Sequence, residues 1–310
     1  MKAVRVHAFG EVPRVERLPE PPGVAGCSRV RIHAATVGHI DRTVWSGRFL
    51  RHPPLPYVPG VEGAGVVLDG ARLAPGTRVW LRGAGLGTRT DGTWREVVDA
   101  PDDALGVLPD AMPFALGSAF FSPCTSAWVA LHEVGLLRPG ERVLVSGASG
   151  AVGSVAVQLA LQAGTEVTAV VSGDEQAARL PAGAVSLVVS RNDIPAGIAA
   201  DLLVDTVGGD LLAALLPAVV PGGRAVLVGY TAGPALAVDM PLFLQRDVAL
   251  LPLNMFRREA AGRAAVPALL ERLADGRLRL EVSEFALDDA ARAMEWIATR
   301  GHRGRAVLVP

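Results

Sequence analysis

The residues with the clearest chemical potential form a glycine-rich turn between a short apolar run and an apolar helical segment. Glycine lets a backbone approach phosphate groups closely, and the N-terminus of a following helix offers free N–H groups and a positive dipole end. The spacing is G-x-x-G-x-x-G instead of the standard G-x-G-x-x-G, so the flanking strand and helix carry the assignment. Without that context the pattern would indicate only a turn. The residues expected to hold a dinucleotide pyrophosphate are Gly147, Gly150, Ala151, Val152 and Gly153.

The elements that must position this turn alternate in type. A long apolar, largely helical segment over 113–137 comes first, and a strand over 142–146 and a helix over 152–162 flank the turn. Strand-like and helical segments then alternate to about residue 256. This alternation predicts a parallel, doubly wound sheet.

The remaining parts of the chain have a different pattern. Before residue 113, short β-branched runs are separated by Gly, Pro and Asp, which predicts a small, partly antiparallel barrel or sandwich. The last part has two amphipathic helices, 264–275 and 289–300, and a terminal strand. We expect this last part to join the first domain, because a lone helix and strand need a partner to bury them.

Composition and charge exclude several classes of protein. Of the 310 residues, 50% are hydrophobic and 20% are charged, and the net charge is −1. A disordered chain is excluded by this composition, and the charge offers no case for a nucleic-acid or anionic-membrane partner. No apolar run reaches a membrane-spanning length, and the N-terminus has no signal-peptide core. We expect a soluble, cytoplasmic protein.

The two cysteines, Cys27 and Cys124, are expected to be free thiols, because a reducing cytosol disfavours a disulfide between them. Two cysteines also cannot build a four-thiolate structural zinc site.

Taken together, eight segments resemble the medium-chain dehydrogenase/reductase superfamily, specifically its zinc-free quinone oxidoreductase branch. Each segment is loose by itself, and their order and spacing are specific. The segments are 35–47, 58–67, 73–80, 91–98, 124–160, 204–210, 222–230 and 304–310.

The resemblance implies an α/β protein with two domains. A GroES-like, β-rich catalytic domain would comprise residues 1–113 and 263–310, and a Rossmann domain with a doubly wound parallel sheet would comprise 114–262. The active site would lie in the cleft between them and take a small-molecule substrate. The resemblance also implies a homodimer formed through edge strands near 249–255, which would hide an open strand edge.

The same resemblance allows a test for zinc, position by position. Zinc-dependent members carry a Cys at the position of Gly38 and a His at that of Val61, with a further ligand near Ser122. Glycine and valine have no ligating side chain, so we expect no catalytic zinc.

The choice between NADPH and NADH depends on the end of the second Rossmann strand. NAD enzymes usually place an acid there to hold the ribose 2′-OH. This chain has Val171, followed by Ser172 and Gly173. Without the acid a 2′-phosphate meets no repulsion, and Ser172 can donate a hydrogen bond to it, which favours NADPH.

Other residues near this position favour NADH. Asp174 and Glu175 follow at once, and no Lys or Arg lies beside them. Arg191 and Arg300 are candidates to supply the missing positive charge from other loops, although both are equally well explained as solvated surface residues. NADH therefore stays an alternative.

Further cofactor contacts are implied by the resemblance. Residues at the C-terminal ends of strands line the crevice where ligands bind in open α/β sheets. Trp128 has the alternative of a core aromatic residue, whereas Asn254 has a better case, because an amide at a strand end is rarely placed for packing. The implied contacts are Ser126, Trp128, Thr206, Gly229, Tyr230, Leu253, Asn254 and Met255.

The catalytic residues are harder to assign. Quinone reductase relatives typically have Asn at the position of Gly38 and often Tyr at Thr43 or Phe49, and this chain departs at all three. His39 is a candidate to donate to a carbonyl or enolate oxygen, against the alternative of a structural or merely exposed side chain. Asp41 is expected to orient the loop, and Thr43 is a weaker candidate to touch the substrate.

These observations predict an NADPH-dependent, zinc-independent oxidoreductase. It would transfer a hydride to a conjugated carbonyl: a quinone, an enone or an enoyl thioester, with a tailoring step in specialised metabolism as one form of this activity. The alternative is an NADPH-binding protein with little catalysis and a structural or sensory role.

Overall fold

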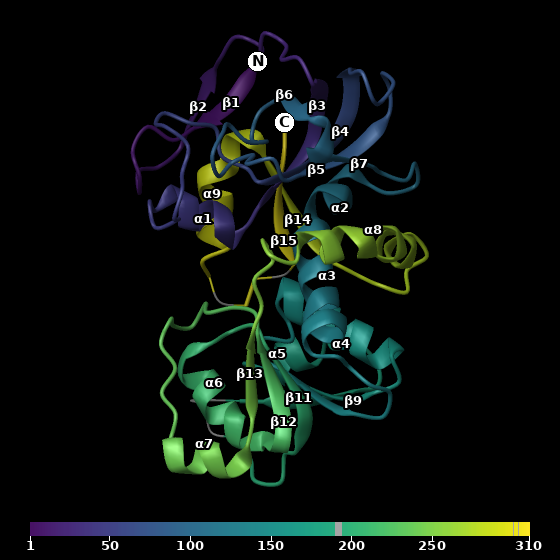
Figure 1. Cartoon of the computed structure of the whole chain (residues 1–310). Helices are drawn as coiled ribbons and strands as arrows, with labels where there is room; N and C mark the ends of the chain where they lie inside the picture. Colours follow the sequence, from purple (N-terminus) through teal and green to yellow (C-terminus); the bar gives the residue numbers. More distant parts are fainter. Residues whose placement is uncertain (190–193, 300, 303) are drawn as a thin grey trace. The chain divides into compact units, whose positions relative to one another are not determined.

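The computed structural model describes residues 1–189, 194–299, 301–302 and 304–310. Two compact units make up the chain, one comprising Met1–Phe121 and Leu280–Pro310 and the other Ser122–Arg279. Figure 1 labels most of the helices and strands along the chain. The fold is mixed α/β, with one largely antiparallel sheet and one parallel sheet, as the sequence predicted.

The first unit is built around a seven-stranded sheet with the order β14-β15-β3-β4-β5-β7, in which β6 also pairs with β3; β1 and β2 form a separate hairpin. The long strand β3 pairs with β4 with register shifts near Arg29 and Ile32. Its first half also pairs with β6 and its second half with β15. The terminal strand and α9 thus lie in the first unit, whereas the helix expected over 264–275 lies in the second. The elements are β1 (Lys2–Arg5), β2 (Arg14–Arg17), β3 (Cys27–Val37), α1 (His39–Trp45), β4 (Glu62–Asp69), β5 (Arg78–Arg82), β6 (Val97–Pro101), η1 (Asp102–Ala104), β7 (Leu105–Val107), α2 (Phe114–Ala119), β14 (Val282–Ala286), η4 (Leu287–Asp289), α9 (Ala290–Trp296) and β15 (Arg305–Val309).

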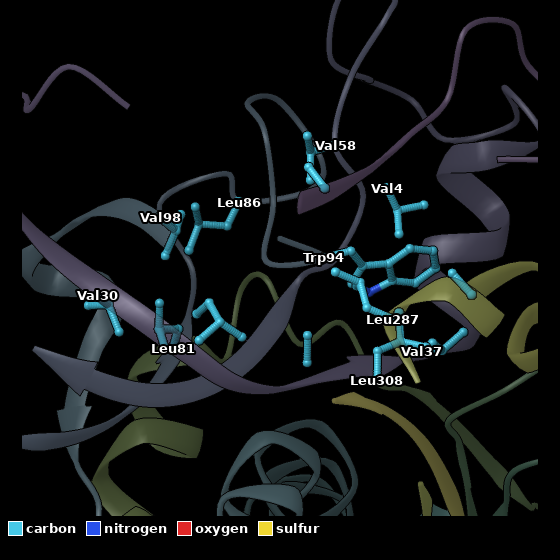
Figure 2. Packing of buried hydrophobic residues seen from close by; sticks show 14 of the residues in the cluster. Val4, Val30, Val37, Val58, Leu81, Leu86, Trp94, Val98, Leu287 and Leu308 are labelled. Atoms are coloured by element: carbon cyan, nitrogen blue, oxygen red, sulfur yellow. The ribbon is translucent and has the colours of Figure 1, made fainter. Parts of the chain in front are cut away.

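The core of this unit gathers around Trp94, which is completely buried. Figure 2 shows its indole among aliphatic side chains, with Leu287 and Leu308 from the C-terminal part of the chain beside it. The indole Nε1 donates a hydrogen bond of 2.9 Å to the carbonyl oxygen of Thr36, which satisfies the ring's only polar atom inside the core. Residues from both ends of the chain are therefore needed to close this core.

The second unit is a six-stranded parallel sheet with the order β10-β9-β8-β11-β12-β13. The chain runs outward from β8 in one direction and then returns to continue from β11 in the other. The point where the strand order reverses lies between β8 and β11, at their C-terminal ends, and this is where such folds bind ligands. The elements are α3 (Phe121–Trp128), which begins at the last residue of the first unit, the π-helix η2 (Val129–Val134), β8 (Arg142–Val145), α4 (Ala151–Gln162), β9 (Glu166–Val171), α5 (Asp174–Ala177), β10 (Ala184–Val188), β11 (Ala200–Asp205), α6 (Gly209–Leu215), η3 (Leu216–Ala218), β12 (Val219–Leu227), α7 (Met240–Arg246), β13 (Ala249–Pro252) and α8 (Glu259–Ala274).

The boundaries of the two units differ from the predicted ones at 113 and 262. Helix α2 packs on β3, β4 and β15 of the first sheet, so it belongs to the first unit. Helix α8 packs on η2 and belongs to the second unit. The alternation of helices and strands could not show which sheet a terminal helix covers, because that depends on tertiary packing.

Two further observations concern the cysteines and the length of the helices. Neither cysteine forms a disulfide among the described residues; Cys124 is buried and Cys27 half-buried. None of the helices in the described part of the chain combines the length and the apolar character that a membrane span needs.

Candidate cofactor site and active-site residues

The glycine turn lies at the C-terminal end of β8, where the strand order reverses. Gly147 has a φ of +59°, in the left-handed region that glycine adopts without strain. A Cβ at this position would lie 2.5 Å from Oγ1 of Thr206 and 2.8 Å from Cγ2 of Val207. Both the backbone conformation and the neighbouring side chains therefore require glycine.

Helix α4 begins directly after this turn and packs closely against it. Gly150 is its N-cap, and a Cβ on Gly153 would lie 2.2 Å from the carbonyl oxygen of Gly147. The first N–H groups of an α-helix, here those of Ala151, Val152 and Gly153, have no acceptor within the helix. The turn thus combines a backbone free of side chains with donors at a positive dipole end, which fits a pyrophosphate.

The C-terminal ends of β11 and β12, the strands that follow β8 in the sheet order, lie next to the same turn. The Thr206 hydroxyl donates a hydrogen bond of 2.8 Å to the carbonyl oxygen of Ser146. A Cβ on Gly229 would lie 2.3 Å from the carbonyl oxygen of Thr206. The structure therefore brings together Gly147, Thr206 and Gly229, which the sequence analysis had placed on three separate strand ends. Tyr230 follows with its side chain 68% exposed.

The end of β13 carries the predicted residues Leu253, Asn254 and Met255. The Leu253 N–H donates to the carbonyl oxygen of Leu227 at 2.9 Å, which extends the pairing of β13 with β12. Oδ1 of Asn254 accepts hydrogen bonds from the N–H groups of Phe256, at 3.0 Å, and Arg257, at 3.3 Å. Its carbonyl oxygen thus has a local role in the turn before α8, a role that the sequence analysis did not consider.

Trp128 lies within a small aromatic and cationic cluster. Its ring centroid is 4.1 Å from that of His132, and the guanidinium of Arg272 lies 5.5 Å from the indole. The indole is half-buried, as is Ser126 on the same helix. Desolvation and, after it, the charge of Arg272 lower the pKa of His132.

The turn after β9 contains the residues predicted to choose the cofactor. Ser172 is exposed, and Gly173 is the N-cap of α5. Glu175 pairs with Arg179 one turn further along, a cation that the sequence analysis did not single out although the i, i+4 spacing was readable. Arg191 and Arg300, the other predicted sources of positive charge, lie outside the described residues.

In the first unit, Asp41 ties the start of α1 to a neighbouring segment. Its two carboxylate oxygens accept hydrogen bonds from the N–H of Gly38, at 2.8 Å, and from the N–H of Val61, at 3.1 Å. Burial raises the pKa of Asp41 to about 7; the Gly38 hydrogen bond opposes the shift and the charge of Glu62 adds to it. These contacts link the first turn of α1 to the backbone at Val61.

A buried ion pair lies beside this loop. Nη2 of Arg305 donates to Oε2 of Glu62 at 2.7 Å, and a Cβ on Gly38 would lie 3.1 Å from the same guanidinium nitrogen. The surroundings of Gly38 and Val61 therefore do not fit a zinc ion: neither residue has a ligating side chain, and a cation already lies next to Gly38. Within the described parts of the chain, no group of three or more His, Cys, Asp and Glu side chains is arranged to share a metal ion.

His39 and Thr43 lie on α1, one turn apart. The Thr43 hydroxyl donates to the carbonyl oxygen of His39 at 2.9 Å, so its proton is used within the helix. The His39 side chain is exposed. Desolvation lowers its pKa, and electrostatic interactions with His302, Arg305 and Arg42 lower it further. The imidazole is thus neutral at pH 7 and retains one N–H donor.

Tyr57 is a buried polar residue that the sequence analysis missed. It is 1% exposed and packs with Val6 and Val44, with Phe49 at the edge of the cluster. Among the described residues its hydroxyl has no hydrogen-bond partner. Burial and then the charge of Asp41 raise the pKa of the phenol. Nothing in the sequence around Tyr57 distinguishes a buried phenol from an exposed one.

Two further buried residues, Ser146 and Asp205, lie beside the glycine turn. Both are completely buried, and the Ser146 hydroxyl donates to Oδ1 of Asp205 at 2.5 Å. The sequence signal for Asp205 is its place as an acid at the end of an apolar strand. An acid in such a place is rarely buried without hydrogen bonds.

A separate pocket of about 110 Å³ lies at the opposite ends of the strands of the parallel sheet. Leu216, Phe243 and Val248 line it. Val248 directly precedes β13, so this pocket lies at the N-terminal ends of the strands and is distinct from the glycine turn.

Comparisons with known proteins agree with this geometry. Residues 25–110 match the family described as alcohol dehydrogenase GroES-like domain, and residues 180–308 match the zinc-binding dehydrogenase family. Acrylyl-CoA reductase AcuI of Ruegeria pomeroyi is 32% identical over 67% of each chain. Quinone oxidoreductase of Pseudomonas aeruginosa is 28% identical over 100% of this chain and 99% of its own.

Solved structures extend the likeness to the whole chain. The quinone oxidoreductase of Thermus thermophilus, whose structure was solved also as its complex with NADPH, has a TM-score of 0.81 and 28% identity, with all of both chains covered.

The chain also aligns with a polyketide synthase subunit of Mycobacterium tuberculosis, of which it spans only 12% of the length.

The chain belongs to the medium-chain dehydrogenase/reductase superfamily, in its quinone oxidoreductase-like branch. This membership confirms the predicted fold class, a GroES-like domain with a Rossmann-type parallel sheet, and makes the protein a member of an oxidoreductase family.

Proposed function

We propose that this protein is an NADPH-dependent, zinc-independent reductase that transfers a hydride to a conjugated carbonyl: a quinone, an enone or an enoyl thioester. The observation that carries the proposal is the tightly packed glycine turn after β8, at the point where the strand order reverses. A side chain is sterically excluded at Gly147, Gly153 and Gly229, in a chain of the quinone oxidoreductase-like branch. Acrylyl-CoA reductase and quinone oxidoreductase among its relatives indicate the substrate class.

Each part of the cofactor has candidate partners in this chain. NADPH, when bound, supplies the hydride. The backbone from Gly147 to Gly153 would hold its pyrophosphate, and the exposed hydroxyl of Ser172 would donate to the 2′-phosphate. Because Val171 stands where an acid would hold the ribose hydroxyl of NAD, the phosphorylated cofactor is favoured.

The substrate oxygen gains negative charge as the hydride adds, so it must receive a hydrogen bond or a proton. Because zinc does not fit beside Gly38, the proposal includes no metal-assisted step. We assign the hydrogen bond to His39, which is exposed and whose neutral imidazole keeps one N–H. Asp41 would hold the loop that presents His39, through the N–H groups of Gly38 and Val61.

The test is turnover of NADPH with a panel of quinones, enones and an enoyl thioester, followed through the absorbance of the reduced nicotinamide. We expect oxidation of NADPH with at least one class, and a lower KM for NADPH than for NADH. Failure to bind either dinucleotide would overturn the proposal. A lower KM for NADH would overturn only the choice of cofactor.

The second candidate is an NADPH-binding protein with little catalysis. It is favoured by the departures from the family pattern on and beside α1: Gly38 has no side chain, and the Thr43 hydroxyl is engaged by the carbonyl oxygen of His39. Measurable NADPH binding without oxidation across the whole panel would support this candidate over the reductase.

We also propose a homodimer that forms through β13. This strand lies at the end of the parallel sheet and pairs with β12 in the described sheet order. An open strand edge favours pairing with another chain. Light scattering coupled to size-exclusion chromatography tests this, and a monomer would reject it.

A further inference from the structure

Asp205 is the last residue of β11 and is completely buried at the edge of the sheet that carries the glycine turn. Its Oδ1 accepts from the Ser146 hydroxyl at 2.5 Å, and its Oδ2 accepts from the N–H of Gly208 at 2.9 Å. Ser146 directly precedes Gly147. One carboxylate therefore connects the turn after β8 with the turn after β11.

The Ser146 side chain is fully used in this connection. Its Oγ donates to Asp205 and accepts from the N–H of Thr206 at 2.9 Å. The Ser146 carbonyl oxygen accepts from the Thr206 hydroxyl, the same group that a Cβ on Gly147 would meet. The position of Gly147 is thus fixed relative to Thr206 by a closed set of hydrogen bonds.

The second turn extends this set toward β12. Gly208 and Gly209 both have positive φ angles. A Cβ on Gly208 would lie 2.8 Å from Cα of Tyr230 and 2.9 Å from the carbonyl oxygen of Gly229. By holding the Gly208 N–H, Asp205 places this turn against the end of β12, where further cofactor contacts are expected.

Burial of this carboxylate has an energetic cost. Burial raises the pKa of Asp205, and the hydrogen bonds from Ser146, Gly208 and Val207 oppose the shift. A buried acid is tolerated when donors compensate the water that it loses. All the donors that compensate Asp205 come from the two turns, so its burial and their positions depend on each other.

The other end of the same two strands offers a natural contrast. Asp201, at the start of β11, accepts from Nε and Nη2 of Arg142 at 3.0 and 2.9 Å, and from the Arg142 N–H at 2.9 Å. The hydrogen bonds from Arg142 lower the pKa of Asp201 to about 2. Asp201 thus joins β8 to β11 at the strand ends away from the glycine turn, and Asp205 joins them at the turn.

We propose that Asp205 is a positioning residue for the nucleotide: through Ser146 and Gly208 it sets the places of the two backbone turns that receive the cofactor. It acts through these turns and need not touch the cofactor itself. The inference rests on the proposed function, because it assigns the turn to NADPH.

The decisive experiment compares Asp205→Asn with Asp201→Asn in the full chain. A carboxamide has one acceptor oxygen where the carboxylate has two, so Asp205→Asn loses a hydrogen bond at the turn. We expect the Kd for NADPH, measured by fluorescence titration, to rise about tenfold, the effect of one hydrogen bond to a charged group. The KM for NADPH should rise with it, while kcat changes by less than about twofold.

Asp201→Asn is the matched control, because it weakens the contact between the same two strands. It should lower the Tm while leaving the Kd for NADPH within about twofold of the wild type, since its edge of the sheet is remote from the turn. Equal changes in Kd for both variants, or an unchanged Kd in Asp205→Asn, would overturn the inference.

A second variant keeps the test decisive should Asp205→Asn fail to fold. Ser146→Ala removes the hydroxyl that links Asp205 to Gly147 and should raise the Kd for NADPH in the same way; an unchanged Kd would overturn the inference. Where both single variants fold, the double variant should show less than the sum of the two effects, because the two residues share the Ser146–Asp205 hydrogen bond. Wild-type protein that binds no NADPH would instead overturn the proposed function as well.

Discussion

The turn at Gly147 and the loop at Gly38 have the same outline: a strand, a glycine and then a helix. Their glycines differ in kind. Gly147 has a φ of +59°, and a Cβ there would lie 2.5 Å from a neighbouring side chain. Gly38 has an extended backbone, with φ of −124°, and its nearest neighbour would be the end of the Arg305 side chain at 3.1 Å. The backbone conformation and the close neighbours require glycine at position 147. The backbone conformation at Gly38 is one that a residue with a side chain of modest size can also adopt.

This difference indicates how each region works. The Gly147 turn presents main-chain N–H groups, so its function depends on backbone shape. The Gly38 loop is held by buried charged side chains, namely Asp41, Glu62 and Arg305. Its function depends on which side chains it presents and on how those charges balance.

The largest expected effect tests the glycines directly. Gly147→Ala should raise the Kd for NADPH beyond tenfold and lower the free energy of unfolding by about 2 kcal/mol or more, because left-handed strain and steric overlap act together. Gly38→Ala should change stability by less than about 1 kcal/mol, since the Arg305 side chain can shift. Urea unfolding and cofactor titration measure both; similar losses in the two variants would break the comparison.

Asp41, among the buried charges of the Gly38 loop, predicts a pH effect on stability. The pKa of Asp41 is raised from 3.8 to about 7 in the folded protein, so the folded state binds more protons than the unfolded state between these values. The contribution of Asp41 to stability is therefore greatest at low pH and falls as pH rises from about 4 to about 7. In Asp41→Asn the free energy of unfolding should change less over this pH range, and the difference from the wild type should be no more than about 4 kcal/mol.

Urea unfolding at a series of pH values measures this slope for the wild type and the variant. Arg305 and Arg82 lower the pKa of Asp41 and Glu62 raises it, so these charges must stay unchanged in the comparison. Identical slopes for the two proteins would show that Asp41 does not titrate in this window.

A smaller effect separates the two candidate side chains on α1. His39→Ala should lower kcat/KM for the conjugated carbonyl about tenfold, or about 1.4 kcal/mol, through loss of one hydrogen bond to the developing charge. Thr43→Val should have less than about a twofold effect, because the Thr43 hydroxyl already donates within the helix. Steady-state kinetics measures both, with Kd for NADPH as the reference. Equal losses would mean that neither hydrogen-bonding group is specifically involved.

The smallest effect concerns the Tyr57 hydroxyl, for which the described part of the chain offers no hydrogen-bond partner. Tyr57→Phe should leave the free energy of unfolding unchanged or raise it by up to about 1 kcal/mol, because removing an unsatisfied buried hydroxyl removes its desolvation cost. Tyr230→Phe, at a side chain that is 68% exposed, is the control and should have no effect. A clear loss of stability in Tyr57→Phe would indicate that a buried water satisfies the hydroxyl.

Local sequence patterns predicted the elements around the glycine turn well. The helix expected over 152–162 is α4 (Ala151–Gln162), and the expected strands before and after it are β8 and β9. The single helical segment expected over 113–137 is instead α2, α3 and the π-helix η2. Helix α1 was not expected, because its short sequence has no long apolar period. Its buried residues are Asp41 and Val44, and Trp45 packs against the core partly buried.

The sequence by itself determined the glycine spacing, the alternation of strands and helices, and the lack of ligating side chains at Gly38 and Val61. These properties belong to single residues or to neighbours along the chain, so they are readable without a fold. Only the tertiary structure decided that Asp205 joins two turns, that Arg305 lies beside Gly38, and that α8 belongs to the second unit. Those contacts join residues far apart in the chain, and they depend on how the strands are ordered in each sheet.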